Sequence, residues 1–202
     1  MAASSSEWVE GSHVWIANQD PFSSAPYVLA TVVEIFEDGT DGTTLTVEEV
    51  ETGKRHTKYR SELSAANADA SKNNAPDDHC GLGHLNEATL LEATRARAEF
   101  GAPYTWCGAS QLLSINPCEP VDGGPSVMAF FRNRTREIGE AEPHAYAVAE
   151  AACARLHRQR RVAVLVSGES GAGKTEASRL VVQYLVWRAA RVEAAGGGVA
   201  GS

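Results

Sequence analysis

A glycine-rich segment, Gly168 to Thr175, carries the residue types that bind phosphate. It reads GESGAGKT and satisfies the pattern GxxxxGK[ST] of nucleotide-binding loops. Glycines let the backbone approach phosphate oxygens, while the N–H groups and the start of the next helix supply partial positive charge. We expect ATP and Mg²⁺ to bind here, with Lys174 on the β- and γ-phosphates and Thr175 on Mg²⁺. The predicted phosphate-binding residues are Gly168, Glu169, Ser170, Gly171, Ala172, Gly173, Lys174 and Thr175.

The alternative is a glycine-rich turn that binds no phosphate. With this composition the pattern would arise by chance in well under about one chain in a hundred. A lysine at the start of a helix also lies at the end where the helix dipole disfavours a cation, so Lys174 has no structural reason to be there. Phosphate binding is therefore the stronger interpretation.

The elements on either side of the loop fit this interpretation. Arg161–Ser167 (RVAVLVS) is a nearly continuous apolar run, which predicts a buried parallel strand. Residues 174–191 predict a helix, and an apolar stripe at helical spacing runs along it: Ala177, Leu180, Val181, Tyr184 and Leu185. The order of strand, glycine loop and helix is typical of a nucleotide-binding fold.

A nucleotide-hydrolysing site also needs a second carboxylate to hold Mg²⁺ through water. The 27 residues after Thr175 contain no aspartate, and their acids are Glu176 and Glu193. No strand that could carry such a carboxylate follows the loop. The catalytic residues are therefore unknown, and it is uncertain whether this chain alone is an enzyme.

Short β-rich runs separated by turn residues predict a small antiparallel barrel over residues 9–63, after a disordered start at 1–8. Its expected strands are centred on 14–16, 27–36, 43–50 and 54–59. A polar linker is expected at 64–76. Beyond it we expect a helix at 86–100, a strand at 104–115 interrupted by Gly108, a helix at about 142–158 packed on a sheet, and a low-complexity tail at 194–202.

Composition excludes several functions. The net charge of −8 gives no basic field for nucleic acid, and no apolar run approaches the roughly 20 residues of a membrane span. The four cysteines form no CxxC pair, which favours reduced thiols in the cytosol. His79, Cys80 and His84 lie close together in sequence, but no second ligand pair at zinc spacing accompanies them.

The octapeptide at 168–175, followed by RLVVQYL at 179–185, resembles the phosphate-binding loop of the myosin motor family. Upstream segments resemble successive myosin motor segments in the same order: HLNE at 84–87, YTWCG at 104–108, Asn116-Pro117 and EPHAYA at 142–147. This resemblance is collinear over 77–187. Residues 9–63 are more loosely similar to the small Src-homology-like barrel that precedes many myosin motors.

The resemblance implies an α/β P-loop NTPase, the amino-terminal part of a myosin motor head over 77–193, preceded by a small all-β barrel. It implies an actin-activated Mg-ATPase whose hydrolysis produces movement on actin filaments in the cytoplasm and cytoskeleton. Light chains or calmodulin would bind only a longer parent chain. Asn116 and Pro117 match the segment that lines the adenine pocket, although this chain continues with Cys118 where myosins commonly have tyrosine.

Two other functions share the glycine-rich motif. A truncated nucleotide-binding module without motor activity has the same residues, because the switch segments and the actin-binding cleft of a myosin would lie beyond Ser202. A small P-loop kinase fits poorly, because such kinases carry the loop near the start of their catalytic domain, whereas 167 residues precede it here.

Overall fold

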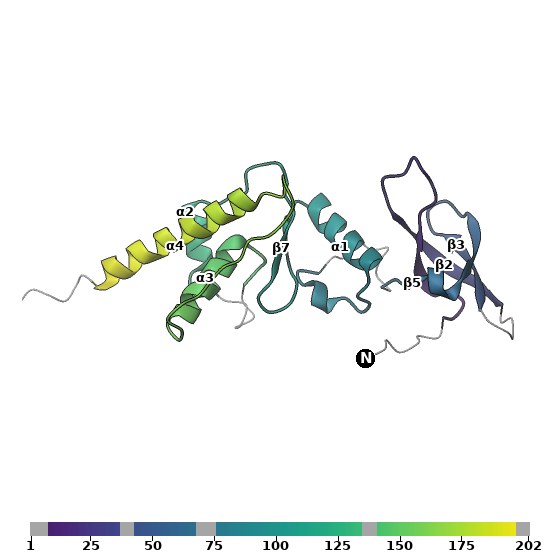
Figure 1. The fold of residues 1–202 in the computed structure, drawn as a ribbon, viewed down its shortest axis with the longest axis horizontal. Coiled ribbons are helices and arrows are strands. Elements are labelled where there is room, and N and C mark those ends of the chain that lie inside the picture. The colour runs from purple at the N-terminus through teal and green to yellow at the C-terminus, as the bar shows by residue number, and fades with distance from the viewer. Residues whose placement is uncertain (1–7, 37–42, 68–75, 135–140, 197–202) are drawn as a thin grey trace, which may run out of the picture. The chain divides into compact units, whose positions relative to one another are not determined.

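The computed structural model describes residues 8–36, 43–67, 76–134 and 141–196, with side chains described as far as Arg191. Its contacts divide the chain into two compact units. The first unit comprises residues 1–75 and 81–96, and the second comprises 76–80 and 97–202 (Figure 1).

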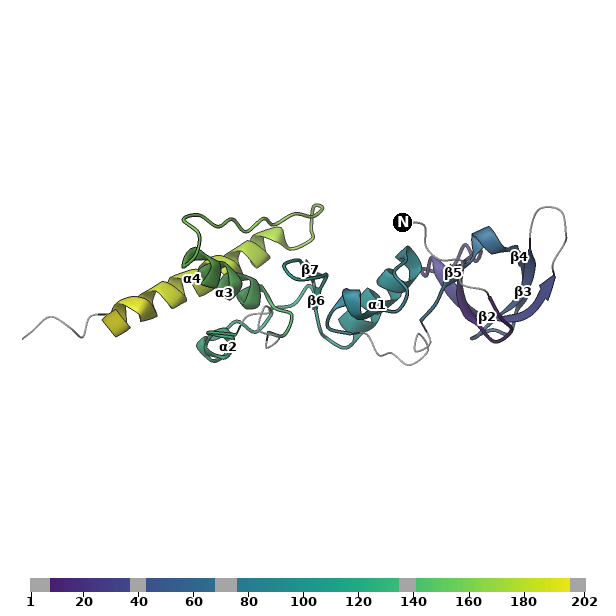
Figure 2. The same ribbon diagram turned by 90° about the horizontal axis from the view of Figure 1, so that it is seen from below.

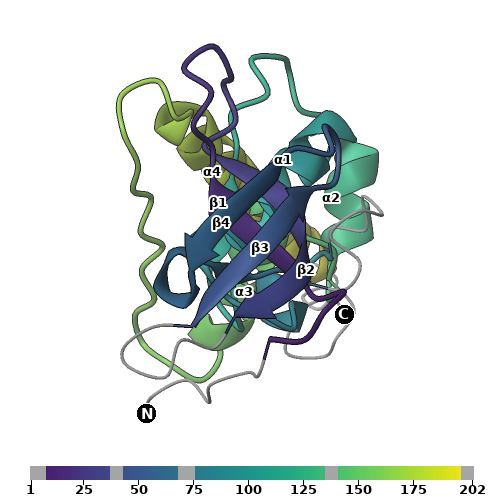
Figure 3. The ribbon, with the colours of Figure 1, turned by 90° about the vertical axis from the view of Figure 1, so that its right-hand side faces the viewer.

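Five strands of the first unit form one antiparallel sheet in the order β4-β3-β2-β1-β5, and Figure 3 labels β1 to β4. Their bounds are β1 His13–Ala17, β2 Tyr27–Phe36, β3 Thr44–Glu49, β4 Arg55–Tyr59 and β5 Ser64–Ala65. The four strands predicted from β-branched and aromatic runs are confirmed, and β2 has the predicted bounds. Among the described residues, the end strands β4 and β5 do not pair with one another, so the observed structure is an antiparallel sheet.

The core of this sheet follows the two-residue period of its strands. Six aliphatic side chains on β1, β2 and β3 are at most 1% exposed: Val14, Ile16, Ala30, Val32, Leu45 and Val47. The opposite face of β1 carries Trp15, which packs against Ala66 and Ala88 and donates its indole N–H to Thr89 Oγ1 at 3.1 Å. Both faces of β1 are therefore covered.

Three predicted boundaries in the first unit need correction. The predicted disordered start includes Trp8, but the large apolar ring of this residue packs against the sheet core. The predicted linker includes Ser64 and Ala65, but they pair with β1 as β5; residues 68–75 of that linker lie outside the described residues. The helix α1 (Glu87–Glu99) is predicted to follow the domain boundary, but Gly81–Ala96 belongs to the first unit.

Asn86 explains why α1 joins the sheet. Its amide donates to the carbonyl of Ala65 in β5 at 2.7 Å, and its Oδ1 accepts the backbone N–H of Thr89 at 3.0 Å. One side chain thus caps the helix and attaches it to the strand. The sequence pattern predicts α1 correctly to within one residue at each end, but a contact made by a single polar side chain leaves no periodic signal.

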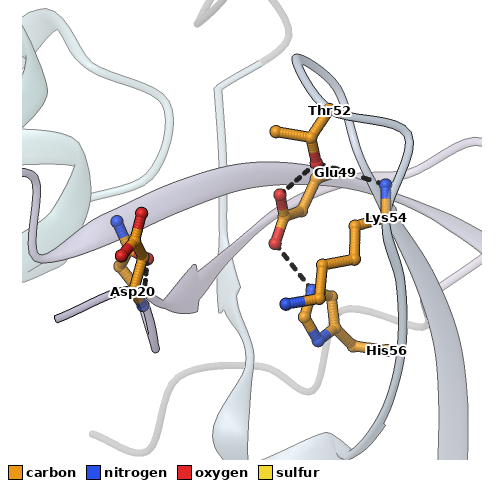
Figure 4. A network of polar contacts seen from close by, with 6 residues as sticks. Asp20, Glu49, Thr52, Lys54 and His56 are labelled. Carbon is orange, nitrogen blue, oxygen red and sulfur yellow. Dashed lines mark hydrogen bonds and ion pairs between the residues drawn. The ribbon is translucent and has the colours of Figure 1, made fainter. Parts of the chain in front are cut away.

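A polar cluster closes the β3–β4 turn (Figure 4). The Glu49 carboxylate accepts the Thr52 hydroxyl and lies 2.6 Å from His56 Nε2, and Thr52 Oγ1 accepts the Lys54 backbone N–H at 3.2 Å. The hydrogen bond from Thr52 is the main cause that lowers the pKa of Glu49, and the hydrogen bond and charge of His56 lower it further. These contacts fix the turn and are local to it.

The described residues of the second unit form a short hairpin, β6–β7, and the helices α2, α3 and α4 (Figure 2). The elements are β6 Tyr104–Trp106, β7 Leu112–Ser114, α2 Pro125–Phe131, α3 Ala145–Leu156 and α4 Lys174–Gly196. The predicted stripe on α4 is confirmed, because Leu180, Val181 and Tyr184 are buried. They pack with α3 and with Phe131 of α2 in one aromatic-rich core.

Four predictions in the second unit change in detail. The predicted interruption at Gly108 is confirmed, and it divides residues 104–115 into two strands, with Gly108 at φ 92° in the loop between them. The second helix begins at Ala145, since His144 has an extended backbone and acts as its N-cap. That helix packs mainly against α4, and Tyr104 and Trp106 of the short strand β6 belong to the same core. Finally, α4 continues to Gly196, within the predicted tail, while residues 197–202 lie outside the described residues.

The predicted buried strand at 161–167 is the largest correction. This segment joins neither of the sheets that the described residues form, and Leu165 is 90% exposed. No backbone hydrogen bond from 161–167 to another described residue occurs. A strand exists only where a neighbour supplies its ladder of hydrogen bonds, and the described residues offer none here. The apolar composition predicts the strand, but not a partner for it.

Gly123 is a point of close approach in this core. Its carbonyl accepts the Tyr146 hydroxyl at 2.8 Å, and an added Cβ would lie 2.6 Å from that hydroxyl and 3.1 Å from Leu180 Cδ2. Since both neighbours are fully buried, Gly123→Ala should lower the free energy of unfolding by about 1–3 kcal/mol. Urea titration followed by circular dichroism measures this. Gly124→Ala is the matched control, because its Cβ would come no closer than 3.6 Å to any neighbour.

Candidate nucleotide-binding site

The glycine loop lies immediately before α4 and depends on three unusual backbone conformations. Gly168, Gly171 and Gly173 have φ values of 154°, 83° and 83°, which side-chain-bearing residues rarely adopt. At Gly168 a Cβ would also approach Ala172 Cβ to 3.2 Å. The loop is partly closed by a hydrogen bond from the Ala172 N–H to the Glu169 carbonyl, 3.2 Å long. The glycines in the motif are thus required by the backbone path.

Lys174 is the first residue of α4, and its side chain reaches back over the loop. Its Nζ donates to the carbonyls of Gly168 at 2.9 Å and Glu169 at 2.6 Å. This places an ammonium group beside the start of a helix, where backbone N–H groups also carry partial positive charge. The arrangement concentrates positive charge at one point on the loop, which suits an anionic ligand.

The remaining predicted loop residues are accessible. Glu169, Ser170 and Thr175 are exposed, and Ala172 is half-buried. Thr175 lies one residue into α4, and next to it Glu176 forms an ion pair with Arg179 within the same helix. The Thr175 hydroxyl is a hard oxygen of the type that Mg²⁺ prefers, so the residues present fit the predicted metal. Magnesium would draw its remaining ligands from phosphate and water.

Asn116, predicted from the resemblance to lie at the adenine, is in direct contact with the phosphate loop. Its Nδ2 donates to the Gly171 carbonyl at 2.8 Å, and its Cβ and Cγ both lie 3.6 Å from the position of a Cβ on Gly173. Its Oδ1 accepts the N–H of Cys118 at 3.0 Å, and Cys118 has φ 57°. Pro117 is exposed beside it. The structure therefore brings the two predicted parts of the site together.

A cavity of about 730 Å³ lies next to the loop. Its walls come from the β6–β7 hairpin, α3, residues 162–168 and the first turns of α4, including Lys174 and Ala177. The lining is mainly apolar, which suits packed side chains better than a triphosphate. The charged face of the loop is thus the better candidate for the phosphates.

A buried polar network holds α4 in place behind the loop. Glu150 of α3 is 3% exposed; its Oε2 accepts the Tyr184 hydroxyl at 2.8 Å and Arg188 Nε at 3.1 Å. Its Oε1 accepts the N–H of Asn133 at 3.0 Å, and Asn133 Oδ1 accepts Arg188 Nη2 at 3.3 Å. Burial, together with the hydrogen bond to Glu150, strongly raises the pKa of Tyr184. The network connects α3, α4 and the segment after α2.

Sequence patterns did not reveal the Glu150 network or the contact between Asn116 and the loop. One signal was available, because Glu150 interrupts ten otherwise uncharged residues from Ala145 to Ala154 and so places a carboxylate on an apolar helix. A buried carboxylate needs a partner. No comparable signal marked Asn116, since 55 residues separate it from Gly171.

His144 is a packing residue and the N-cap of α3. Its Nδ1 accepts the Tyr146 N–H at 3.0 Å, and its ring stacks on Phe131 with centroids 4.9 Å apart. Tyr104 and Tyr146 approach it edge-on at 5.0 and 4.6 Å. Burial lowers the pKa of His144 from 6.5 to about 4, while Asp122 acts in the opposite direction. The fold therefore holds this imidazole neutral.

This shift predicts that acid destabilises the second unit. Between pH 6.5 and about 4 the unfolded chain binds a proton at His144 that the folded chain resists, so stability falls as pH decreases. Across that window the loss should be on the order of 3 kcal/mol. Urea titrations at several pH values measure it. His144→Asn keeps a capping acceptor and should flatten the pH dependence; an unchanged slope in this variant would contradict the assignment.

The candidate ligands His79, Cys80 and His84 do not converge. Within the described residues, no group of three or more histidine, cysteine or acidic side chains is placed to hold a metal ion. His79 Nδ1 lies 3.8 Å from Cys107 Sγ, and burial lowers the pKa of His79. The described helices also include none with the length and apolarity to cross a membrane.

In a comparison with known proteins, residues 76–198 match the family model "Myosin head (motor domain)". The matched residues are more than half of the chain. Unconventional myosin-IXa of Mus musculus is 40% identical over 112 residues, covering 54% of this chain and 4% of that protein. Myosin-15 of Arabidopsis thaliana is 31% identical over 179 residues, covering 88% of this chain and 11% of that protein.

Myosin-2 heavy chain, non muscle, of Acanthamoeba castellanii is 33% identical over 164 residues, which cover 80% of this chain and 10% of that protein. The chain spans about a tenth or less of the length of these relatives. The family match covers the loop, Asn116, α3 and α4, which are the elements that form the candidate site. The chain belongs to the myosin head (motor domain) family.

Proposed function

We propose that this chain binds MgATP at Gly168–Thr175 and forms the nucleotide-binding part of an actin-based myosin motor. The observation that supports this most directly is Lys174, whose ammonium group lies over the glycine loop at the start of α4. Lys174 and the loop N–H groups would bind the phosphates, and Thr175 would bind Mg²⁺. Pro117 would contact the adenine, with Asn116 beside it.

The motor activity itself is proposed from the family. In this proposal the parent protein is an actin-activated Mg-ATPase of the cytoplasm and cytoskeleton, and residues 76–198 belong to its P-loop head. The N-terminal antiparallel sheet would be the counterpart of the small Src-homology-like barrel that precedes many myosin motors. Actin filaments would be its partner. The part of the chain that the structure describes contributes phosphate binding, and these residues alone offer no base or second magnesium carboxylate for hydrolysis.

A nucleotide-binding module without motor activity is the second candidate. It is favoured by Glu176, the acid next to Thr175, because its carboxylate is paired with Arg179 and not directed to a metal ion. The two candidates differ in turnover and agree on binding.

The test is titration of the 202-residue chain with a fluorescent ATP analogue in Mg²⁺, followed by phosphate release with and without actin filaments. Saturable binding that ATP competes away would support the first part of the proposal. Binding without turnover would favour the non-catalytic module for this chain, whereas actin-stimulated turnover would favour the motor. Absence of saturable binding at millimolar ATP would contradict both.

A further inference from the structure

We propose that Asn116 is a positioning residue for the phosphate loop: it holds the Gly171 carbonyl by a hydrogen bond and so fixes the orientation of the Gly171–Ala172 peptide. This inference rests on the proposed nucleotide function and changes the role that the resemblance assigns to Asn116. The resemblance places Asn116 at the adenine, whereas the contacts that its side chain makes with distant residues are with the phosphate loop.

The first step is the orientation of the Asn116 amide. Its Oδ1 accepts the Cys118 N–H at 3.0 Å, which leaves Nδ2 directed at the Gly171 carbonyl, 2.8 Å away. An amide with one end fixed by a backbone donor has little freedom to rotate or flip. Cys118 supports this geometry with φ 57°, a conformation that is uncommon for a residue with a side chain.

The second step is the effect on the loop backbone. In a trans peptide the carbonyl of one residue and the N–H of the next point in opposite directions. Holding the Gly171 carbonyl toward Asn116 therefore turns the Ala172 N–H to the other side, where it meets the Glu169 carbonyl at 3.2 Å. One side-chain hydrogen bond thus determines the direction of a loop N–H.

The third step concerns the freedom of the loop. Gly171 and Gly173 both have φ 83°, and glycine is the residue whose backbone is least restricted. Asn116 donates to the Gly171 carbonyl and lies close to Gly173, where an added Cβ would be 3.6 Å from Asn116 Cβ and Cγ. A loop preformed in this way loses less conformational entropy when it binds phosphate.

The experiment compares wild type, Asn116→Ala, Asn116→Asp and the control Glu119→Ala, an exposed residue of the same segment, with thermal melts to show that each variant folds. The first readout needs no ligand: amide spectra and ¹⁵N relaxation of Gly171 and Gly173. Aspartate can still accept the Cys118 N–H but cannot donate to Gly171. If Asn116 acts on the loop, both Asn116 variants should shift and loosen these amides, and Glu119→Ala should not.

A role confined to the local turn with Cys118 predicts that Asn116→Asp behaves like wild type, and that result would overturn the inference.

The second readout is affinity for MgATP and for magnesium tripolyphosphate, which lacks adenosine. Asn116→Ala should weaken both by the same factor, about tenfold for one hydrogen bond. Loss of ATP affinity alone would place Asn116 at the adenine and overturn the inference. Wild type that binds neither ligand would contradict the proposed function, while the amide spectra would still decide the role of Asn116.

Discussion

Lys174→Met should abolish most nucleotide binding, with a loss of MgATP affinity of about 100- to 1000-fold. The Lys174 ammonium can donate to two phosphate groups, and a hydrogen bond to a charged group contributes about 1.5–3 kcal/mol. Methionine retains the length of the side chain and removes the charge. Since Lys174 lies on the half-exposed loop and not in the core, the melting temperature should change little. Titration with a fluorescent ATP analogue measures the affinity.

The matched control for Lys174 is Arg179→Ala, on the same helix. Arg179 is 57% exposed and forms an ion pair with Glu176, so its removal changes the charge of the helix without removing the group over the loop. We expect this variant to bind MgATP within about threefold of wild type, because exposed charges are well screened by salt. Equal losses in both variants would mean that the helix merely attracts anions and that the loop makes no specific phosphate contact.

Glu150→Ala should be the most destabilising single change in the second unit, at about 3–5 kcal/mol. The substitution leaves the Tyr184 hydroxyl and the Asn133 N–H without their acceptor. It also leaves Arg188, whose side chain is 15% exposed, without the carboxylate that compensates its charge. Because native domains are stable by only about 5–15 kcal/mol, such a loss is a large share of the total free energy of unfolding. Urea titration followed by helical circular dichroism measures it.

Two comparisons separate this network from ordinary surface charge. Glu176→Ala removes a carboxylate that is 52% exposed and ion-paired with Arg179, and should cost less than about 1 kcal/mol. Tyr184→Phe removes one hydrogen bond from Glu150 and should cost about 1 kcal/mol. Similar costs for Glu150→Ala and Glu176→Ala would show that the buried network adds nothing to stability.

Sequence patterns predict well those elements whose own residues determine them. The strand Tyr27–Phe36 is bounded by turn residues and has the predicted ends, and the stripe on α4 buries Leu180, Val181 and Tyr184 as expected. In both cases periodicity follows from the backbone repeat. By contrast, α2 was not predicted, because seven residues give too few turns for an apolar period to be distinguished.

Predictions fail where structure depends on a distant partner. The run at 161–167 has the composition of a buried strand, but composition does not supply the neighbouring strand that its backbone requires. The phosphate loop could be found because its glycines and lysine are contiguous. The hydrogen bond from Asn116 to that loop could not be, since no local rule relates residues 55 positions apart.

The exposed course of residues 161–167 has a consequence for handling the protein. The segment contains a continuous apolar run from Val162 to Val166, and its charged residue is Arg161. It forms no backbone–backbone hydrogen bond to other described residues. Short apolar segments of this kind, without proline and with low charge, promote aggregation through strand pairing. Aggregation should therefore limit the concentration at which the chain can be kept in solution. Leu165 is 90% exposed, so replacing it with a charged residue should raise the concentration at which the chain stays in solution.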